Sequence, residues 1–321
     1  EYGAWDSHAL RDLPDPVPGP GEIVVDTAAM SVNFPDVLMV EGLYQHKPPA
    51  PVIAGFDAAG IVSAIGPDVT RVSVGDRVLI YVPDGAFAER AVARDVHAYR
   101  IPDAMSFTDA AAFGLVYLTA HVSMIDNAAC RAGETVLVTG ASGGVGLAMV
   151  QYGAALGMTV IGGVTSSAKA ELVMAHGAAG TVDLTAEPLR DTVREQVHGL
   201  TDGRGVDVVM DMVGGDVFDA CLRAIAYGGR IAVVGFASGR IPQIPANYLL
   251  LKRITAIGSP LGSRRDDTLE MRDRAMREVL DMWQQGRISP VITETLPLAE
   301  WKTAFGRFKQ RAVTGKIVMV P

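Results

Sequence analysis

The chain has 321 residues, 49% of them hydrophobic and 20% charged, which suffices for a large buried core and excludes global disorder. Its 28 basic and 36 acidic side chains give a formal net charge of −8. This charge argues against a nucleic acid or an anionic membrane as partner, because both select a basic surface. No stretch approaches the roughly 18 consecutive apolar residues of a membrane-spanning helix. Cys130 and Cys221 are too few for a disulfide framework or a four-thiolate metal site, so we expect a reduced, cytoplasmic protein.

The first hundred residues have the pattern of a β-rich region. Val- and Ile-rich runs at 22–32, 58–66, 76–82 and 86–93 alternate with Gly, Pro and Asp, as in short strands joined by turns. Prolines at alternate positions of residues 14–20 make the entry segment extended. The sequence starts without Met just before this segment, which leaves open whether a further strand precedes it.

The pattern changes near residue 107. Residues 106–130 are rich in Ala and have helical spacing. Apolar strands are then expected at 134–140, 158–164, 180–184, 206–213 and 230–236, separated by helical segments such as 145–157 and 168–177. This alternation predicts a parallel sheet covered by helices on both faces. A charged, solvated helix is expected at 263–286, followed by a short helix and a closing strand at 315–321.

A glycine-rich loop joins the first of these strands to its helix. The loop reads Gly140-Ala141-Ser142-Gly143-Gly144-Val145-Gly146. A strand before it and a helix after it are the context that a dinucleotide fingerprint requires. Gly143 would let the backbone approach a pyrophosphate, Gly146 would let the helix pack close to the strand, and the free N–H groups of the helix would bind the phosphates. Ala141 stands in the place of the first glycine of the usual motif, so the loop is a variant, and a tight turn without a ligand is the alternative.

Two other enzyme classes fit this loop less well. Residues 140–144 also match the G-x-S-x-G elbow of hydrolases, but the later histidines, His176 and His198, lie in or near helical segments. The loop together with Tyr248 and Lys252 also matches short-chain dehydrogenases. Those enzymes begin with the loop, whereas here more than a hundred residues precede it.

The histidines before the loop are His8, His46, His97 and His121. None of them is paired with another His or a Cys at the spacing of metal ligands, so surface or core roles are expected.

The end of the second strand in this βαβ unit decides between the two nicotinamide dinucleotides. An NAD site usually carries an acid about 20 residues after the loop, where it holds the ribose 2′-OH. Residues 160–169 contain no acid, and Ser166 and Lys169 are donors suited to a 2′-phosphate. The sequence therefore favours NADPH over NADH, with an ordinary surface lysine as the alternative interpretation of Lys169.

Further motifs are spread over the chain, and together with the loop they resemble the medium-chain dehydrogenase/reductase superfamily, specifically its zinc-independent NADPH:quinone oxidoreductase branch. The matching segments lie at 16–36, 42–44, 54–66, 74–78, 118–120, 139–146, 211–215, 228–239 and 314–321. The resemblance implies an α/β protein with two domains. One is a GroES-like, β-rich catalytic domain (residues 1–116 and 262–321), and the other is a doubly wound Rossmann dinucleotide-binding domain (residues 117–261).

The resemblance also bears on zinc. The zinc-dependent members of the superfamily hold a catalytic zinc with a Cys near the position of Asn33 and a His before an acidic residue. In this chain Phe56 stands before Asp57, where that His would be, and the four-cysteine lobe of those members is missing. The resemblance therefore implies that no metal takes part in the reaction.

The site residues follow from the same resemblance. Tyr44, Asn33 and Thr119 are the expected catalytic residues. Asn33 and Thr119 would hydrogen-bond the nicotinamide ribose or carboxamide, and Tyr44 would donate to the substrate oxygen or act as a lid residue. Asp36 and Asp57 are expected to hold local structure. The expected cofactor-binding residues are Ala141, Gly143, Gly144, Val145, Gly146, Ser166, Lys169, Val213, Gly235, Phe236 and Arg311.

The expected function is that of an NADPH-dependent reductase acting on a small molecule. Hydride would pass to a quinone or to an activated alkene, with Tyr44 or water as proton donor, and the resemblance implies a homodimer. One alternative is an enoyl-thioester or acrylate-type reductase, which the sequence does not separate from the first. The other is a non-catalytic, crystallin-like NADPH-binding protein. The presence of Asn33, Tyr44 and Thr119 together favours catalysis.

Overall fold

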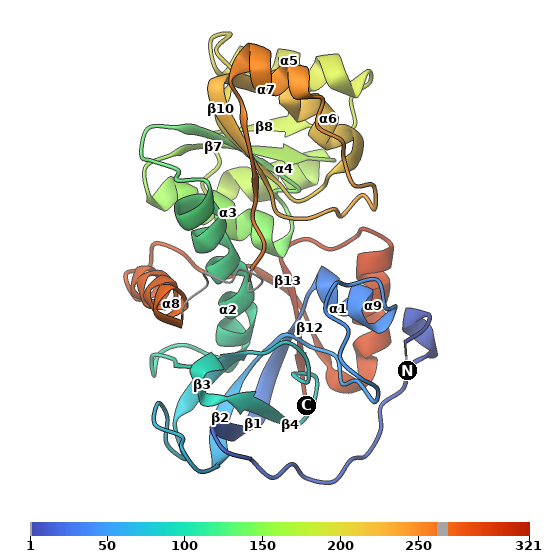
Figure 1. Cartoon of the computed structure of the whole chain (residues 1–321), viewed down its shortest axis with the longest axis vertical. Helices are drawn as coiled ribbons and strands as arrows, with labels where there is room; N and C mark the ends of the chain where they lie inside the picture. The colour runs from blue at the N-terminus through green and yellow to red at the C-terminus, as the bar shows by residue number, and fades with distance from the viewer. Residues whose placement is uncertain (1, 262–268) are drawn as a thin grey trace. The chain divides into compact units, whose positions relative to one another are not determined.

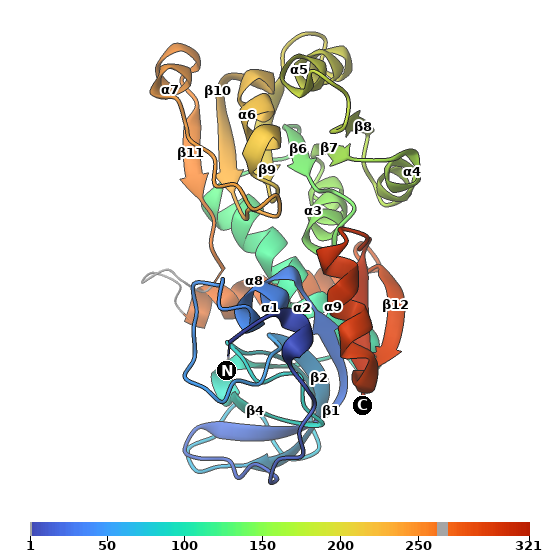
Figure 2. The same cartoon turned by 90° about the vertical axis from the view of Figure 1, so that its right-hand side faces the viewer.

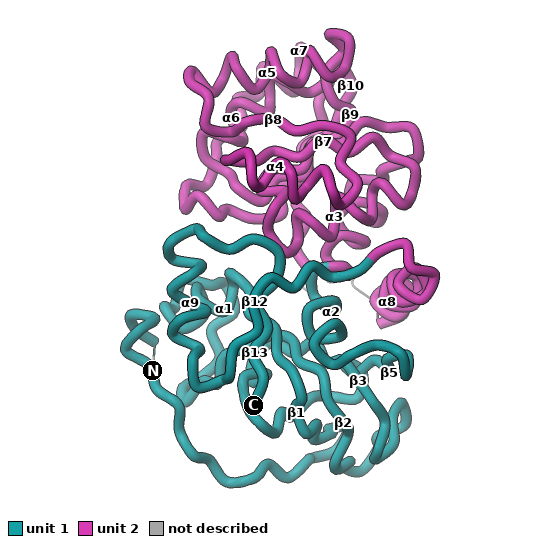
Figure 3. Tube along the Cα trace, turned by 180° about the vertical axis from the view of Figure 1, so that it is seen from behind, with its two compact units in different colours: residues 1–116, 289–321 teal, residues 117–288 magenta. Residues whose placement is uncertain are grey.

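The computed structural model describes residues 2–261 and 269–321, which form two compact units (Figure 3). Unit 1 comprises residues 1–116 and 289–321, and unit 2 comprises residues 117–288. Each unit has its own sheet and its own apolar core. The predicted fold class, a GroES-like domain with a Rossmann domain, is confirmed by these two sheets and by the family matches described below.

Unit 1 is built on a seven-stranded sheet in the order β12-β13-β1-β2-β3-β5, with β4 also paired to β1 (Figure 1). Its strands are β1 (Glu22–Val32), β2 (Asp57–Ile65), β3 (Arg77–Tyr81), β4 (Arg90–Arg94), β5 (Ala98–Arg100), β12 (Ile292–Pro297) and β13 (Lys316–Val320), and its helices are α1 (Phe34–Val40) and α9 (Trp301–Lys309). Short 3₁₀ turns lie at Trp5–Ser7, Asp95–His97 and Leu298–Glu300. The last strand, β13, runs antiparallel to the first, with Val32 opposite Ile317.

Unit 2 is built on a six-stranded parallel sheet in the order β11-β10-β9-β6-β7-β8 (Figure 2). Its strands are β6 (Thr135–Thr139), β7 (Thr159–Val164), β8 (Gly180–Asp183), β9 (Val206–Asp211), β10 (Ile225–Val233) and β11 (Thr255–Gly258). The order turns back between β6 and β9, which makes the gap beyond their carboxyl ends the switch point where doubly wound sheets bind ligands. Because parallel crossovers are right-handed, α3 and α4 lie on one face of the sheet and α5 and α6 on the other.

The helices of this region are α2 (Phe107–His121), the π-helix Val122–Asn127, α3 (Gly144–Ala155), α4 (Ser167–Ala175), α5 (Leu189–Leu200), α6 (Gly215–Ala224), α7 (Ala246–Lys252) and α8 (Leu269–Gln284). Among the described residues, the stretch Phe107–Asn127 is the one helix long and apolar enough to cross a membrane. However, 78% of its most apolar window is buried inside the protein. Its apolar character is therefore that of a core helix.

The end of unit 2 differs from the expected domain boundary. The sequence predicts that the second segment of the first domain begins at residue 262. In the structure that segment begins after Ile288. Residues 262–268, including the start of the expected charged helix, lie outside the described residues, and α8 begins at Leu269. The buried His121 contacts Glu278 of α8 at 2.7 Å, and Arg274 of α8 pairs with Asp126. These polar contacts attach α8 to unit 2.

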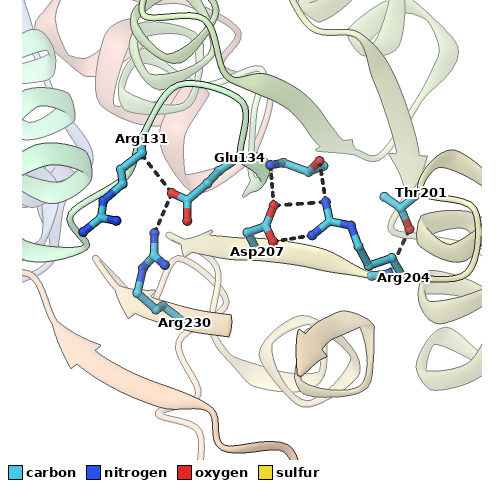
Figure 4. Close-up of polar contacts among 8 residues, drawn as sticks. Arg131, Glu134, Thr201, Arg204, Asp207 and Arg230 are labelled. Carbon is cyan, nitrogen blue, oxygen red and sulfur yellow. Dashed lines mark hydrogen bonds and ion pairs between the residues drawn. The ribbon is translucent and has the colours of Figure 1, made fainter. Parts of the chain in front are cut away.

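Charged side chains connect the start of β6 with the start of β9 and with Arg230 inside β10 (Figure 4). Glu134 accepts from the Arg131 backbone N–H at 2.8 Å and from the Arg230 guanidinium at 2.7 Å. Arg204 pairs with Asp207 nearby. The glycine loop leaves β6 at its other, carboxyl end. This network therefore connects the strands at the end of β6 that is opposite to the switch point.

Candidate active site

A buried polar cluster forms in unit 1 where three strand ends meet. Asn33 follows β1, Asp57 begins β2 and Lys316 begins β13, and β1 pairs with both other strands. Asp36 lies in the first turn of α1, directly after Asn33. All four side chains are buried, with relative exposures of 6% or less. We call these four residues the Lys316 cluster.

Asn33 connects the other members of this cluster. Its backbone N–H donates to the Asp36 carboxylate at 2.6 Å. Its side-chain amide donates to the Ser31 carbonyl at 3.1 Å and to Asp57 Oδ1 at 2.7 Å. Its Oδ1 accepts from Lys316 Nζ at 2.6 Å. Both amide N–H groups thus have partners inside unit 1, which favours a structural role for Asn33 over the expected donation to a nicotinamide.

The electrostatics of the cluster follow from its burial. Burial raises the pKa of Asp36 well above its usual value, and the neighbouring Asp57 raises it further. Burial also raises the pKa of Asp57, to about 6, although Lys316 and Asn33 oppose the shift. Asp36 Oδ1 and Asp57 Oδ2 accept no hydrogen bond from the described part of the chain. Burial thus raises the pKa of both carboxyl groups, and the ammonium of Lys316 is the positive charge that opposes both shifts.

Tyr44 is attached to this cluster by its backbone and by its ring. The backbone N–H groups of Leu43 and Tyr44 both donate to the Leu38 carbonyl of α1, at 2.8 and 3.2 Å. The rings of Tyr44 and Phe56 form a T-shaped pair, with 5.5 Å between the ring centroids. Burial, and then the charge of Asp36, raise the pKa of the half-buried Tyr44. Its hydroxyl is therefore protonated at neutral pH and able to donate.

The glycine loop of unit 2 has a geometry that separates the roles of its glycines. A Cβ on Gly146 would lie 2.3 Å from the Gly140 carbonyl oxygen, so α3 can approach the loop only with glycine there. A Cβ on Gly143, the N-cap of α3, would meet that oxygen at an ordinary 3.5 Å. Gly146 is thus required by the packing of the protein itself, whereas Gly143 leaves an open approach to the N-terminus of α3. A loop of this shape fits a dinucleotide pyrophosphate.

A buried carboxylate that the sequence analysis did not single out holds the switch point together. Asp211, at the end of β9, accepts from the Thr139 hydroxyl at the end of β6 at 2.7 Å and from the Gly214 N–H at 2.9 Å. The Thr139 hydroxyl accepts from the Met212 N–H at 3.1 Å. These bonds fix the loop after β9, whose Val213 side chain lies closest to Gly140. The sequence does contain a signal for Asp211, because it is an acidic residue within an otherwise apolar strand. A buried carboxylate is unfavourable unless it accepts hydrogen bonds, so such a residue is expected to have specific partners.

The end of β7 presents polar groups that are largely exposed. Ser166 caps α4, where its hydroxyl accepts from the Lys169 N–H at 3.4 Å. Lys169 Nζ donates to the Thr165 hydroxyl at 3.2 Å. Gly235 and Phe236 follow β10, with the Gly235 N–H donating to the Asp211 carbonyl. The expected cofactor-binding residues, apart from Arg311, therefore gather in unit 2 at the carboxyl ends of β6, β7, β9 and β10.

The remaining expected residues are divided between the units. Arg311 follows α9 in unit 1 with a left-handed backbone, φ 55°. Asn33 and Tyr44 lie in unit 1, and Thr119 is buried in the part of α2 that belongs to unit 2. Their assignment to one nicotinamide pocket rests on the family resemblance and stays a prediction.

Tyr248 and Lys252 do not form the pair that a short-chain dehydrogenase would need. The Tyr248 hydroxyl accepts from Arg190 at 3.0 Å. Lys252 Nζ donates to the carbonyl oxygens of Arg223 and Ile225, at 3.0 and 2.6 Å, and so caps the end of α6. Both side chains are engaged in the structure of unit 2.

Two family descriptions match the chain, one in each unit. Residues 19–103 match the alcohol dehydrogenase GroES-like domain, and residues 144–279 match the domain described as zinc-binding dehydrogenase. The two sheets and the glycine loop at the switch point agree with these matches. Fold and loop together define a medium-chain dehydrogenase/reductase, which is an oxidoreductase class.

Comparison with similar proteins shows to which family within this class the chain belongs. A quinone oxidoreductase of Pseudomonas aeruginosa is 35% identical over 321 residues, which cover 100% of this chain and 97% of its own length. A quinone oxidoreductase-like protein 2 homolog of Nematostella vectensis is 38% identical over 303 residues, covering 94% of this chain and 82% of its own. The crystal structure of Escherichia coli quinone oxidoreductase complexed with NADPH matches with a TM-score of 0.91 at 28% identity, covering 100% of this chain and 98% of that one. The chain belongs to the quinone oxidoreductases of this superfamily, as its motifs predicted.

The second matching domain is described as zinc-binding, but the residues that the structure describes do not form a zinc site. Among residues 2–261 and 269–321, no three His, Cys, Asp or Glu side chains are grouped as metal ligands. The buried Phe56 packs against Tyr44, and the cation that interacts with Asp36 and Asp57 is the Lys316 ammonium.

The two glycines of the loop are expected to respond differently to alanine. Gly146→Ala should lower the thermal unfolding temperature, because the new methyl group meets backbone atoms that cannot move away. Gly143→Ala should leave the unfolding temperature nearly unchanged but weaken dinucleotide binding by tenfold or more, about 1.4 kcal/mol. Thermal unfolding and fluorescence titration of both variants would check this. Equal unfolding temperatures, or unchanged binding by Gly143→Ala, would contradict it.

Proposed function

We propose that this chain is an NADPH-dependent reductase that transfers hydride to a quinone or to an activated alkene such as an enone, without a metal. The observation that carries the proposal is the acid-free end of β7, with Ser166 and Lys169, beside a glycine loop at the switch point. A carboxylate there would repel a 2′-phosphate, whereas an ammonium and hydroxyl groups attract it. The NADPH complex of the Escherichia coli relative supports the same choice.

Each group of residues has one task in this proposal. Residues 141–146 would hold the pyrophosphate on the N-terminus of α3, and Ser166 and Lys169, with Arg311, would hold the 2′-phosphate. Val213, Gly235 and Phe236 would border the cofactor after β9 and β10. NADPH, when bound, supplies a hydride from C4 of its nicotinamide. Thr119 would orient the nicotinamide, and the protonated Tyr44 hydroxyl would bind the substrate oxygen and donate a proton to it.

The proposed absence of a metal agrees with the type of substrate. Alcohol oxidation usually needs a Lewis acid to stabilise an alkoxide. A quinone or an enone is already electrophilic, so a hydrogen-bond donor at its oxygen is enough to stabilise the charge that develops there. Tyr44 provides such a donor, and the cluster behind it has no metal-ligand set among the described residues.

The proposal is tested with a substrate panel. The enzyme is dialysed against EDTA, analysed for zinc, and assayed with NADPH on ortho- and para-quinones, enones, acrylates and enoyl-CoA esters. We expect turnover of quinones or enones and no stoichiometric zinc. A preference for enoyl-CoA esters or acrylates would show that the protein is an enoyl-thioester or acrylate-type reductase and not a quinone or enone reductase. NADPH binding without turnover of any compound would favour a crystallin-like protein, and a zinc required for activity would refute the metal-free reaction.

The cofactor preference should depend on Lys169. We expect NADPH to bind at least tenfold tighter than NADH, a difference of about 1.4 kcal/mol. Lys169→Ala should remove much of this preference and leave NADH affinity nearly unchanged, because only NADPH carries the 2′-phosphate. Lys302→Ala is the matched control, since that lysine binds the Asp6 carbonyl in unit 1. Equal affinities of the wild type for NADPH and NADH in a fluorescence titration would contradict the assignment.

Tyr44 and Thr119 should give different kinetic effects. If Tyr44 donates the proton, Tyr44→Phe should lower kcat by roughly 10²-fold with little change in NADPH affinity. If it only shapes the pocket, the same change should act mainly on the substrate KM. Thr119→Val should weaken nicotinamide orientation by about 1 kcal/mol, the contribution of one hydrogen bond. Steady-state kinetics on one good substrate would decide, and wild-type constants in both variants would show that these residues lie outside the site.

The edge of the unit 2 sheet supports the expected homodimer. Within the described residues β11 pairs only with β10, at the edge of the sheet (Figure 2). Its Thr255, Ala256 and Gly258 are exposed. Leu250 and Leu251 of the neighbouring α7 are 78% and 71% exposed. An open strand edge with adjacent apolar side chains can pair with a second copy of itself, and sedimentation velocity would measure whether it does.

A further inference from the structure

Lys316 is a buried lysine at a point where a lysine is unexpected. The residue is 4% exposed, and burial lowers the pKa of its ammonium, opposed by Asp57 and Asp36. Its Nζ donates to Asn33 Oδ1 at 2.6 Å and to the Val32 carbonyl at 3.3 Å. A buried ammonium is unfavourable unless charges and hydrogen bonds compensate it. Both hydrogen bonds are made at the end of β1, so the compensation of this charge depends on how that strand end is placed.

The first connection from Lys316 to Tyr44 runs through α1. Lys316 holds the Asn33 side chain, and the Asn33 N–H binds the Asp36 carboxylate, which fixes the first turn of α1. Helix α1 spans only Phe34–Val40, so its two ends move together. At its far end the Leu38 carbonyl accepts from the Tyr44 N–H. A displacement of Asn33 is therefore transmitted to the backbone of Tyr44.

The second connection runs through the start of β2. Asn33 donates to Asp57 Oδ1 at 2.7 Å, and Asp57 is held in the sheet opposite Ser31. Phe56, the residue before it, is 5% exposed and packs against the Tyr44 ring in a T-shaped arrangement. Backbone and ring of Tyr44 thus depend on the same four-residue cluster.

We propose that Lys316, at the start of the last strand, is a positioning residue for Tyr44: it holds Asn33 and balances Asp36 and Asp57, and so places the Tyr44 hydroxyl for proton donation. This inference rests on the proposed role of Tyr44 in the reductase. Without the Lys316 ammonium, the carboxyl groups of Asp36 and Asp57 would lie close together with no cation in the four-residue cluster. The cluster would then have to bind a further proton or expand, and either change would shift α1 and Phe56.

The experiment is a double-mutant cycle between Lys316 and Tyr44. Lys316→Met keeps the length of the side chain and removes its charge. We expect it to lower kcat by about tenfold to a hundredfold, because small displacements of a positioned group cost this much in rate, with little change in NADPH affinity. In Tyr44→Phe the same Lys316 substitution should lower kcat by less than about twofold, because the group that it positions is already gone. Lys316→Arg, which keeps the charge, should recover part of the activity.

Lys252→Met provides the matched control. Lys252 is also a partly buried lysine whose ammonium binds carbonyl oxygens, but it caps α6 in unit 2. Its loss should lower the unfolding temperature without lowering kcat. If Lys316→Met does not fold, Lys316→Met combined with Asp57→Asn removes the cation and one carboxyl together and enters the same cycle.

Three results would overturn the inference. The first is a wild-type kcat in the folded Lys316 variants. The second is an equal loss of kcat when Lys316 is substituted in the wild type and in Tyr44→Phe, which would show that Lys316 acts independently of the hydroxyl. In both cases a large effect of Tyr44→Phe alone would leave the proposed function standing. The third is a wild-type kcat in Tyr44→Phe itself, which removes the proposed role of Tyr44 and this inference together, while the substrate panel still reports on the reductase activity.

Discussion

The pairing of β13 with β1 is the contact on which unit 1 depends. It joins the last strand of the chain to the first one, so the residues of unit 2 form an insertion within a single sheet. It also sets Lys316 beside Asn33. Because β1 pairs with β2 on its other side, the same strand collects Asp57 into the cluster. One antiparallel pairing therefore completes the sheet and assembles the buried charges behind Tyr44.

Each unit has a buried carboxylate just after or at the end of a strand, and the hydrogen bonds of that carboxylate fix the backbone that follows the strand. Asp211 in unit 2 binds Thr139 and the N–H groups that follow β9, which fixes the switch point. Asp36 in unit 1 binds the Asn33 N–H and fixes the start of α1. A buried carboxylate is unfavourable when it is unbonded, so each arrangement is held by the large penalty of losing it. Rigid placement of backbone near a binding region follows from that penalty.

The opposite ends of the unit 2 strands serve different purposes. Near the amino-terminal ends, Glu134 before β6 pairs with Arg230 of β10, and Arg204 pairs with Asp207 at the start of β9 (Figure 4). The carboxyl ends carry the glycine loop, the cap of α4 and the Asp211 network. The N-termini of α3 and α4, with their free N–H groups and positive dipole ends, lie at the carboxyl ends of the strands, so an anionic ligand is favoured at that edge of the sheet.

The sequence by itself determined the class of fold, the glycine loop and the acid-free end of β7. These features are local: strand and helix periods, the glycine spacing and the charges after β7 all lie within short segments, so neighbouring residues suffice to predict them. The predicted strand 22–32 agrees with β1, and 134–140 contains β6. The short α1, with a proline in its first turn, and the edge strand β11 were not predicted, because their signals are too short. Only the tertiary structure decided that Thr139 meets Asp211, 72 residues away, and that Lys316 meets Asn33, 283 residues away. Which buried charge compensates which depends on the strand ends that the folded sheet brings together, and no local pattern in the chain records that pairing.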